Sequence, residues 1–195
     1  MRIEIRNLSK SFGNHKLFDH ISLCIEERKI TCLYGASGCG KTTMLNILGL
    51  VEPYDSGEIT YNGKTIKNRR NTLNFLRNDV GFIFQDFGLL DNETVWENMQ
   101  IVYRIKKMKD AKMKMEKVLN DLNLQGMLDR KVYELSGGEQ QRIAIAKIML
   151  KDPDLILADE PTASLDDENK QIVLSMLRML QQKGKTILIV SHDEQ

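Results

Sequence analysis

The chain has few cysteines and no marked excess of charge of either sign. Its 195 residues include 3 Cys, and 28 Lys and Arg stand against 27 Asp and Glu. Three cysteines without paired spacing, Cys24, Cys32 and Cys39, argue against a disulfide framework or a zinc site and favour a reducing compartment. A net charge of +1 gives no electrostatic footprint for nucleic acid, so we expect no nucleic-acid partner.

Long apolar runs are also absent. No window approaches the roughly 18 consecutive apolar residues of a membrane span. Residues 1–5 alternate like a strand and lack the apolar core of a signal peptide. We therefore expect a soluble, cytoplasmic protein whose membrane role, if it has one, comes through a partner. Two of the cysteines, Cys24 and Cys32, lie in apolar strand patterns and are predicted to be core residues, whereas Cys39 is predicted to contribute backbone.

Residues 35–43 carry the most informative motif of the chain. The pattern has two glycines bracketing four residues, followed by Lys and a hydroxyl residue, and its members are Gly35, Ala36, Ser37, Gly38, Cys39, Gly40, Lys41, Thr42 and Thr43. An apolar run at 30–34, read as a buried strand, precedes it, and helical spacing at 44–48 follows. Inward-turned amides and a helix N-terminus bind anions. We expect Lys41 to reach the β- and γ-phosphates and Thr42 to hold Mg²⁺.

The strand patterns predict an α/β fold with a second, antiparallel layer. Residues 2–6 and 17–26 alternate as in a half-exposed antiparallel sheet, with a loop at 9–13 between them. Residues 58–61 read as a strand with a hairpin turn at 62–63, and 80–84, 154–158 and 185–190 read as buried strands. Within the predicted loop, Phe12 is either a core anchor or a ring that stacks on a planar ligand.

The composition of the chain changes between residues 94 and 127, where strand patterns end and Met, Lys, Leu and Asn dominate a helical stretch. We place a helical subdomain at about 86–150. Its methionines are Met99, Met108, Met113, Met115 and Met127. They are either helix core beside a solvated Lys face or an adaptable surface for a partner helix.

Two further stretches place polar residues where chemistry is expected. Ser136, Gly137 and Gly138 before a strong helix former indicate a helix start open to an anion, although an ordinary capped helix has the same pattern. Asp159 and Glu160 end an apolar strand, and carboxyl ends of parallel strands face the phosphate site. Asp159 fits a Mg²⁺ partner and Glu160 fits a residue that meets the attacking water.

These motifs occur as an ordered set. The phosphate loop, Gln85, LSGGEQQR at 135–142, LILADE at 155–160, ASLD at 163–166 and His192 resemble the ATP-binding-cassette (ABC) ATPases in order and approximate spacing. LSGGEQQR is the most specific of them, and the resemblance covers essentially the whole chain. It implies a P-loop NTPase core, with a small antiparallel β layer and a helical subdomain, that binds and hydrolyses ATP.

The resemblance also implies a role for each motif. Phe12 would stack on adenine, and residues 35–43 would bind the phosphates. Gln85 would contact Mg²⁺ and the attacking water, Asp159 would support Mg²⁺, Glu160 would be the general base, and His192 would hold the γ-phosphate. The remaining residues would act at an interface with a second copy of the chain. Ser136, Gly137 and Gly138 would bind the γ-phosphate of the ATP that the other copy holds, and residues 163–166 would cross the interface between the subunits.

Within the family, the stretches at 80–90, 94–99 and 159–166 resemble the branch of macrolide exporters, lipoprotein-release transporters and bacteriocin-type peptide exporters. We therefore expect an ATPase subunit that powers a separate membrane permease from the inner face of the cell membrane. Its partners would be that permease and a second copy in a head-to-tail dimer with ATP sandwiched between them. A non-transport, ATP-gated module of cell division or envelope signalling has the same motifs and is the alternative.

Overall fold

The structure is a computed structural model that describes residues 1–106 and 109–192. Its antiparallel sheet has the strand order β2-β1-β4, formed by β1 (Ile3–Phe12), β2 (His15–Ile25) and β4 (Ser56–Tyr61). One face is buried through Ile3, Ile5 and Leu8 of β1. The prediction of a loop at residues 9–13 is wrong, because β1 continues to Phe12, which pairs with His15. Shifts in register along this hairpin let the ladder continue, and the turn shrinks to residues 13–14.

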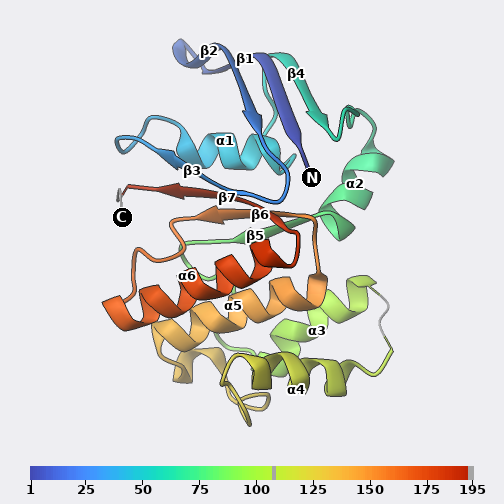
Figure 1. The fold of residues 1–195 in the computed structure, drawn as a ribbon, viewed down its shortest axis with the longest axis vertical. Coiled ribbons are helices and arrows are strands. Elements are labelled where there is room, and N and C mark those ends of the chain that lie inside the picture. The colour runs from blue at the N-terminus through green and yellow to red at the C-terminus, as the bar shows by residue number, and fades with distance from the viewer. Residues whose placement is uncertain (107–108, 193–195) are drawn as a thin grey trace.

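The parallel sheet has the order β3-β7-β6-β5 and carries the phosphate loop (Figure 1). Its strands are β3 (Ile30–Tyr34), β5 (Val80–Ile83), β6 (Leu155–Asp159) and β7 (Thr186–Ser191). The two central strands are apolar runs, as expected for strands covered on both faces. The predicted burial of β3 is wrong, because this strand lies at the edge of the sheet and Tyr34 is 48% exposed.

Helices fill the space on both sides of the parallel sheet. Their bounds are α1 (Lys41–Leu48), α2 (Arg69–Asn78), α3 (Val95–Lys106), α4 (Ala111–Asp121), α5 (Gly137–Lys151) and α6 (Asp167–Gln182), with a short 3-10 turn at Val132–Glu134. Helix α1 lies between the two sheets, α5 and α6 cover the opposite face, and α3 and α4 lie beyond α5 (Figure 1). Within the described ranges, no helix is long and apolar enough to cross a membrane.

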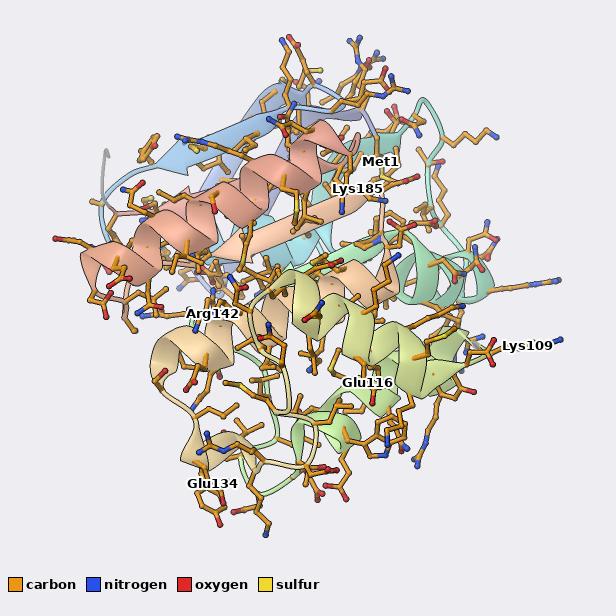
Figure 2. The ribbon with its side chains drawn as sticks, turned by 60° about the horizontal axis from the view of Figure 1, so that its bottom comes forward. Met1, Lys109, Glu116, Glu134, Arg142 and Lys185 are labelled. Carbon is orange, nitrogen blue, oxygen red and sulfur yellow. The ribbon has the colours of Figure 1, made fainter. Side chains whose placement is uncertain are left out.

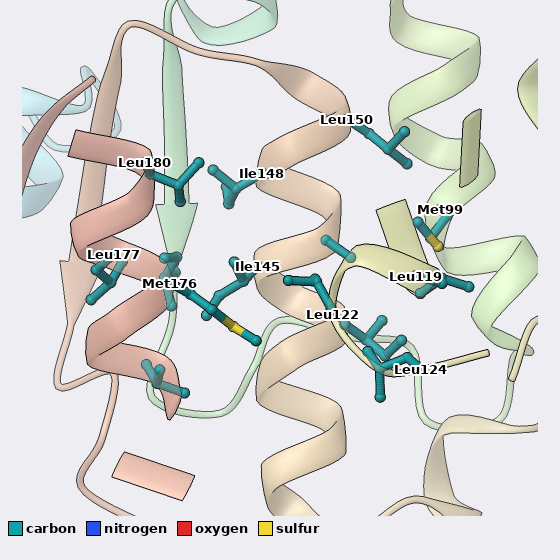
Figure 3. Packing of buried hydrophobic residues seen from close by; sticks show 14 of the residues in the cluster. Met99, Leu119, Leu122, Leu124, Ile145, Ile148, Leu150, Met176, Leu177 and Leu180 are labelled. Atoms are coloured by element: carbon teal, nitrogen blue, oxygen red, sulfur yellow. The ribbon is translucent and has the colours of Figure 1, made fainter. Parts of the chain in front are cut away.

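Helix α5 is the shared wall between the parallel sheet and the outer helices. Figure 3 shows Ile145 and Ile148 of α5 packing towards Met176 and Leu180 of α6. On its other side, the apolar cluster continues through Met99, Leu119, Leu122 and Leu124. A second cluster fills the space between the two sheets around α1. The α/β architecture with an antiparallel layer and added helices is as predicted.

The two sheets are also tied together at the N-terminus. The ammonium group of Met1 donates a hydrogen bond of 2.9 Å to Thr186 Oγ1 at the start of β7. Figure 2 shows Met1 beside Lys185 at this junction. The same threonine Oγ1 accepts a 2.8 Å bond from the Arg28 N–H, so one buried hydroxyl joins three segments of the chain.

The predicted burial of Cys24 and Cys32 is wrong, and the methionines divide between the two alternatives left open for them. All three cysteines are free and exposed. Cys24 lies on the face of β2 opposite the half-buried Ile21 and Leu23, and Cys32 lies on the edge strand β3. Met99 and Met115 are buried, in keeping with helix core. The remaining three differ: Met113 is 64% exposed, Met127 is partly buried, and Met108 lies outside the described residues.

Candidate functional site

The phosphate loop connects the carboxyl end of β3 to α1, and its backbone turns at glycines. Gly38 and Gly40 have φ angles of +79° and +98°, which favour glycine. A Cβ atom at Gly40 would lie 2.8 Å from the ring of Phe18. Gly40 is also the residue before α1, and no side chain caps that helix. The amides of the first turn of α1 therefore face the loop, where an anion can accept their hydrogen bonds.

Lys41 braces the loop from inside. Its ammonium group donates to the carbonyl oxygens of Gly35 at 2.6 Å and Ala36 at 3.1 Å. It also lies 3.3 Å from Nδ1 of His192. Because these partners lie around the loop, the charge of Lys41 is held at the position where a phosphate would be cradled.

The carboxylates lie at the end of β6, as the sequence predicts. Asp159 is the last residue of that strand, and Glu160 follows with a φ angle of +46°. The Glu160 N–H donates to the carbonyl of Val190 at 2.9 Å, which fixes this bend against β7. The bend brings Glu160 Oε1 to 2.5 Å from Nε2 of His192. His192 thus lies between the carboxylate of Glu160 and the ammonium of Lys41.

A cavity of about 430 Å³ brings most of the predicted site residues together. Its wall is formed by Phe12, His15, Leu17, Ser37, Gly38, Gly40, Lys41, Thr42, Thr43, Gln85, Asp159, Glu160 and His192. Three members of the phosphate loop, Gly35, Ala36 and Cys39, and the stretch 136–138 are not part of this wall. Sequence reasoning missed His15 and Leu17. The sequence carries no signal for them, because His15 reaches the cavity through its pairing with Phe12 across a two-residue turn.

Phe12 is at the rim of this cavity and is half exposed, so it is not a core anchor. Its ring is covered on one side by the ammonium of Lys10, 4.4 Å from the ring centroid. Lys10 is itself buried and forms a 2.5 Å ion pair with Glu52. The ring is therefore held in place beside the phosphate loop, with half of its surface available to a ligand.

The stretch 136–138 forms the start of α5, as predicted. Ser136 Oγ accepts a 3.3 Å bond from the N–H of Glu139, and the carboxylate of Glu139 accepts a 2.8 Å bond from the N–H of Ser136. The hydrogen bond from this backbone amide lowers the pKa of Glu139. At Gly138, a Cβ atom would lie 2.2 Å from Oδ1 of Asn169 on α6. Only glycine therefore fits here without displacing Asn169.

Helix α5 holds the two loops that follow β5 and β6. The ammonium of Lys147 donates to the carbonyl of Gly88 at 2.9 Å, three residues after Gln85. The side-chain amide of Gln141, which is buried, donates to the carbonyl of Pro161 at 2.7 Å, directly after Glu160. Gln85 and Glu160 are therefore each connected through one short loop to the helix that Ser136 caps.

Comparisons with known proteins agree with this geometry. A family profile described as "ABC transporter" matches residues 18–163. The lipoprotein-releasing system ATP-binding protein LolD of Porphyromonas gingivalis is 42% identical over 100% of this chain and 91% of its own. The macrolide export ATP-binding/permease protein MacB of Campylobacter jejuni is 38% identical, over 98% of this chain but only 30% of its own length.

Solved structures give the same result. A dimeric bacterial ABC transporter cassette, MJ0796, superposes with a TM-score of 0.87 at 30% identity and covers 98% of this chain and 88% of its own. A post-hydrolysis dimer of the same cassette with ADP and Pi superposes with a TM-score of 0.86. The phosphate loop, the helix start at Ser136 and these relatives lead to one conclusion: the chain belongs to the ABC transporter family, as an ATP-binding ATPase of the branch that includes LolD and MacB.

Proposed function

We propose that this chain hydrolyses ATP to power a separate membrane permease that exports a peptide, a lipoprotein or a drug-like compound. The export direction rests on the likeness to the lipoprotein-releasing and macrolide-export proteins. The comparisons do not favour the alternative of a non-transport module. The subunit would work on the inner, cytoplasmic face of the membrane, attached through the permease. The helical subdomain at 86–150 would communicate with that permease, and Gln85 would connect it to the nucleotide.

The donor set around the phosphate loop fits Mg²⁺ together with ATP. Thr42, Gln85 and Asp159 present a hydroxyl, an amide and a carboxylate to the same cavity. These are oxygen donors, which Mg²⁺ prefers, and the ion is ordinarily held by one or two carboxylates together with nucleotide phosphates. Among the residues that the structure describes, no group of three or more His, Cys, Asp or Glu side chains could hold a metal alone. Mg²⁺ would therefore bind with the nucleotide, whose charge it partly neutralises.

Three side chains would act on the γ-phosphate. Lys41 would exchange the carbonyls of Gly35 and Ala36 for phosphate oxygens. Glu160 would accept a proton from the attacking water, whose oxygen bonds to the γ-phosphorus as the bond to the ADP oxygen breaks. His192 would leave Glu160 and donate to the γ-phosphate. The contact between His192 and Glu160 supports this exchange, because it places both groups within reach of one point in the cavity.

One observation carries the proposal of an ATP sandwich. The phosphate loop and the carboxylates line one cavity, whereas Ser136, Gly137 and Gly138 are not part of its wall. The chain therefore has two places for an anion but one general base. A head-to-tail dimer would solve this mismatch by placing Ser136 of each copy over the ATP held by the other. The dimeric state of the similar cassette MJ0796 supports association of two copies.

The substitution Glu160→Gln tests the sandwich. It removes the general base and one negative charge while keeping the shape of the side chain. ATP should then bind without being hydrolysed, and the protein should elute at twice its mass of 22.4 kDa in the presence of ATP and Mg²⁺. The matched control is Glu168→Gln on the exposed first turn of α6, which changes charge equally and should stay monomeric and active.

Light scattering coupled to gel filtration provides the readout. Glu160→Gln should form the dimer with ATP but not with ADP, because ADP lacks the γ-phosphate that both copies share. If this variant binds ATP and still elutes as a monomer, the sandwich is wrong. If it hydrolyses ATP at the wild-type rate, the assignment of Glu160 as general base is wrong.

A further inference from the structure

The positive charge of this nearly neutral chain is unevenly distributed. Residues 59–78 contain five Lys and Arg and no Asp or Glu. The other 175 residues hold 23 Lys and Arg against 27 Asp and Glu, so the rest of the molecule is net negative. A segment with this composition on an otherwise acidic protein orients the molecule towards a negatively charged surface.

Helix α2 arranges part of this charge on one outward face. Its start is capped by Asn68, whose side chain accepts a hydrogen bond from the N–H of Asn71. Its inner side carries Phe75, which is buried and whose ring centroid lies 4.7 Å from that of Tyr61. The outward side carries four exposed residues that lie on one side of the helix, the α2 basic face: Arg69, Arg70, Leu73 and Arg77. Together with Asn71 and Asn74 they line one hollow of about 830 Å³.

The charges of this face are not used within the chain. None of the three arginines has an ion pair with an acidic side chain in the described residues 1–106 and 109–192. Leu73, in the middle of the face, is 53% exposed. The C-terminal end of α2 is fixed by Lys151, whose ammonium donates to the carbonyl of Leu76 at 2.7 Å. The face is thus a rigid surface of free cations around one apolar side chain.

This face is remote from the nucleotide cavity. Helix α2 ends one residue before β5 and leads into its amino end, whereas Gln85, Asp159 and His192 lie at the carboxyl ends of the parallel strands. Figure 1 shows α2 at the opposite end of the parallel sheet from the end of β7. Substitutions on the α2 basic face should therefore leave hydrolysis of ATP unchanged.

We infer that the α2 basic face binds directly to the surface of a membrane that contains anionic phospholipids. The guanidinium groups of Arg69, Arg70 and Arg77 would pair with lipid phosphates, and Leu73 would enter between the headgroups. Two features favour a lipid surface over nucleic acid or an acidic protein. Leu73 has no role in binding to a phosphate backbone. The second feature rests on the proposed function, since a subunit attached to a membrane permease works next to a lipid surface. The contact would be peripheral and would add to the one made through the permease.

Flotation with lipid vesicles tests this inference on the full chain. The probes are vesicles of phosphatidylcholine alone and vesicles in which a third of the lipid is phosphatidylglycerol. We expect binding only to the anionic vesicles, and release at high salt. The triple variant Arg69→Gln, Arg70→Gln and Arg77→Gln should bind about a hundredfold more weakly, because each basic residue near an anionic surface contributes on the order of fivefold.

One charge-matched control and one further variant separate the contribution of this face to vesicle binding from the effect of net charge and from a general attraction of cations to polyanions. The control Lys112→Gln, Lys114→Gln and Lys117→Gln removes the same charge from the exposed side of α4, near Glu116 in Figure 2, and should bind vesicles as the wild type does. Leu73→Ser should weaken vesicle binding about tenfold, because it removes the apolar side chain that enters the lipid.

Three results would overturn the inference. One is equal binding to both kinds of vesicle, and another is an equal loss in the α4 control and in the arginine variant. The third is binding of the wild type to a short DNA duplex, through the same arginines, as tight as its binding to anionic vesicles. Unchanged ATP hydrolysis by the arginine variant in solution confirms that it is folded, so that its loss of vesicle binding reports on the surface alone.

Discussion

Ser136 offers a way to separate a structural role from a functional one in the same side chain. Its hydroxyl accepts from the N–H of Glu139 and donates to the carboxylate of Glu139 at 2.8 Å, while the Ser136 N–H donates to that carboxylate. This reciprocal pair caps α5, the helix that separates the parallel sheet from α3 and α4. The same hydroxyl is proposed to bind the γ-phosphate held by the second copy.

The substitution Ser136→Ala removes both side-chain bonds and leaves the backbone bond to Glu139. Replacing an N-cap serine by alanine lowers the free energy of unfolding by about 1 kcal/mol. For a chain of this length, that loss lowers the melting temperature by roughly 2–4 °C. The fold should survive, because the apolar contacts of α5 with Met176 and Leu119 are unaffected. ATP-dependent dimer formation should be lost as well, and Ser136→Ala alone cannot separate the two effects.

Ser136→Asn provides the separation. Asparagine caps helices about as well as serine, so the melting temperature should return to within about 1 °C of the wild-type value. Its larger side chain should not restore the contact with the γ-phosphate, so the dimer should remain absent. Both substitutions are introduced into the Glu160→Gln background, and melting is followed by circular dichroism and dimer formation by light scattering. If Ser136→Asn restores the dimer together with the stability, Ser136 acts only as a cap and its proposed role in trans is wrong.

The remaining predictions concern the cavity and the cap. Lys41→Ala should weaken ATP binding about a hundredfold in calorimetry, since charged hydrogen bonds to phosphate are lost; affinity within threefold of wild type refutes the role of Lys41. Phe12→Ala should weaken ATP binding roughly tenfold and Phe12→Tyr should not, as expected if an aromatic ring stacks on the base. The pKa of Glu139 is lowered in the folded protein, so its carboxylate contributes fully to the stability of the fold above the ordinary pKa of glutamate. This contribution is lost as the pH falls through the lowered pKa. The stability difference between wild type and Glu139→Gln should shrink in that acidic range; a constant difference contradicts the effect.

The chemistry of this protein could be predicted from its sequence because each motif is local. The phosphate loop, with its two glycines, Lys41 and Thr42, joins a strand to a helix. It specifies an anion site through backbone geometry that a few neighbouring residues determine. The same holds for the cap at Ser136, since its partner Glu139 is only three residues away. Asp159 could be placed because the end of an apolar strand is evident in the sequence.

The tertiary structure decided what distant segments do to one another. Cys32 has an apolar strand pattern, yet it is exposed, because strand order places β3 at the edge of the sheet. His15 entered the cavity through its pairing with Phe12, and α2 was not evident because only Phe75 of its ten residues is buried. Apolar periodicity reports local spacing, whereas edge positions, cavity walls and outward faces depend on which segments become neighbours after folding. The sequence therefore determined the nucleotide chemistry, and the fold alone gathered that chemistry into one cavity and left the α2 basic face turned outward.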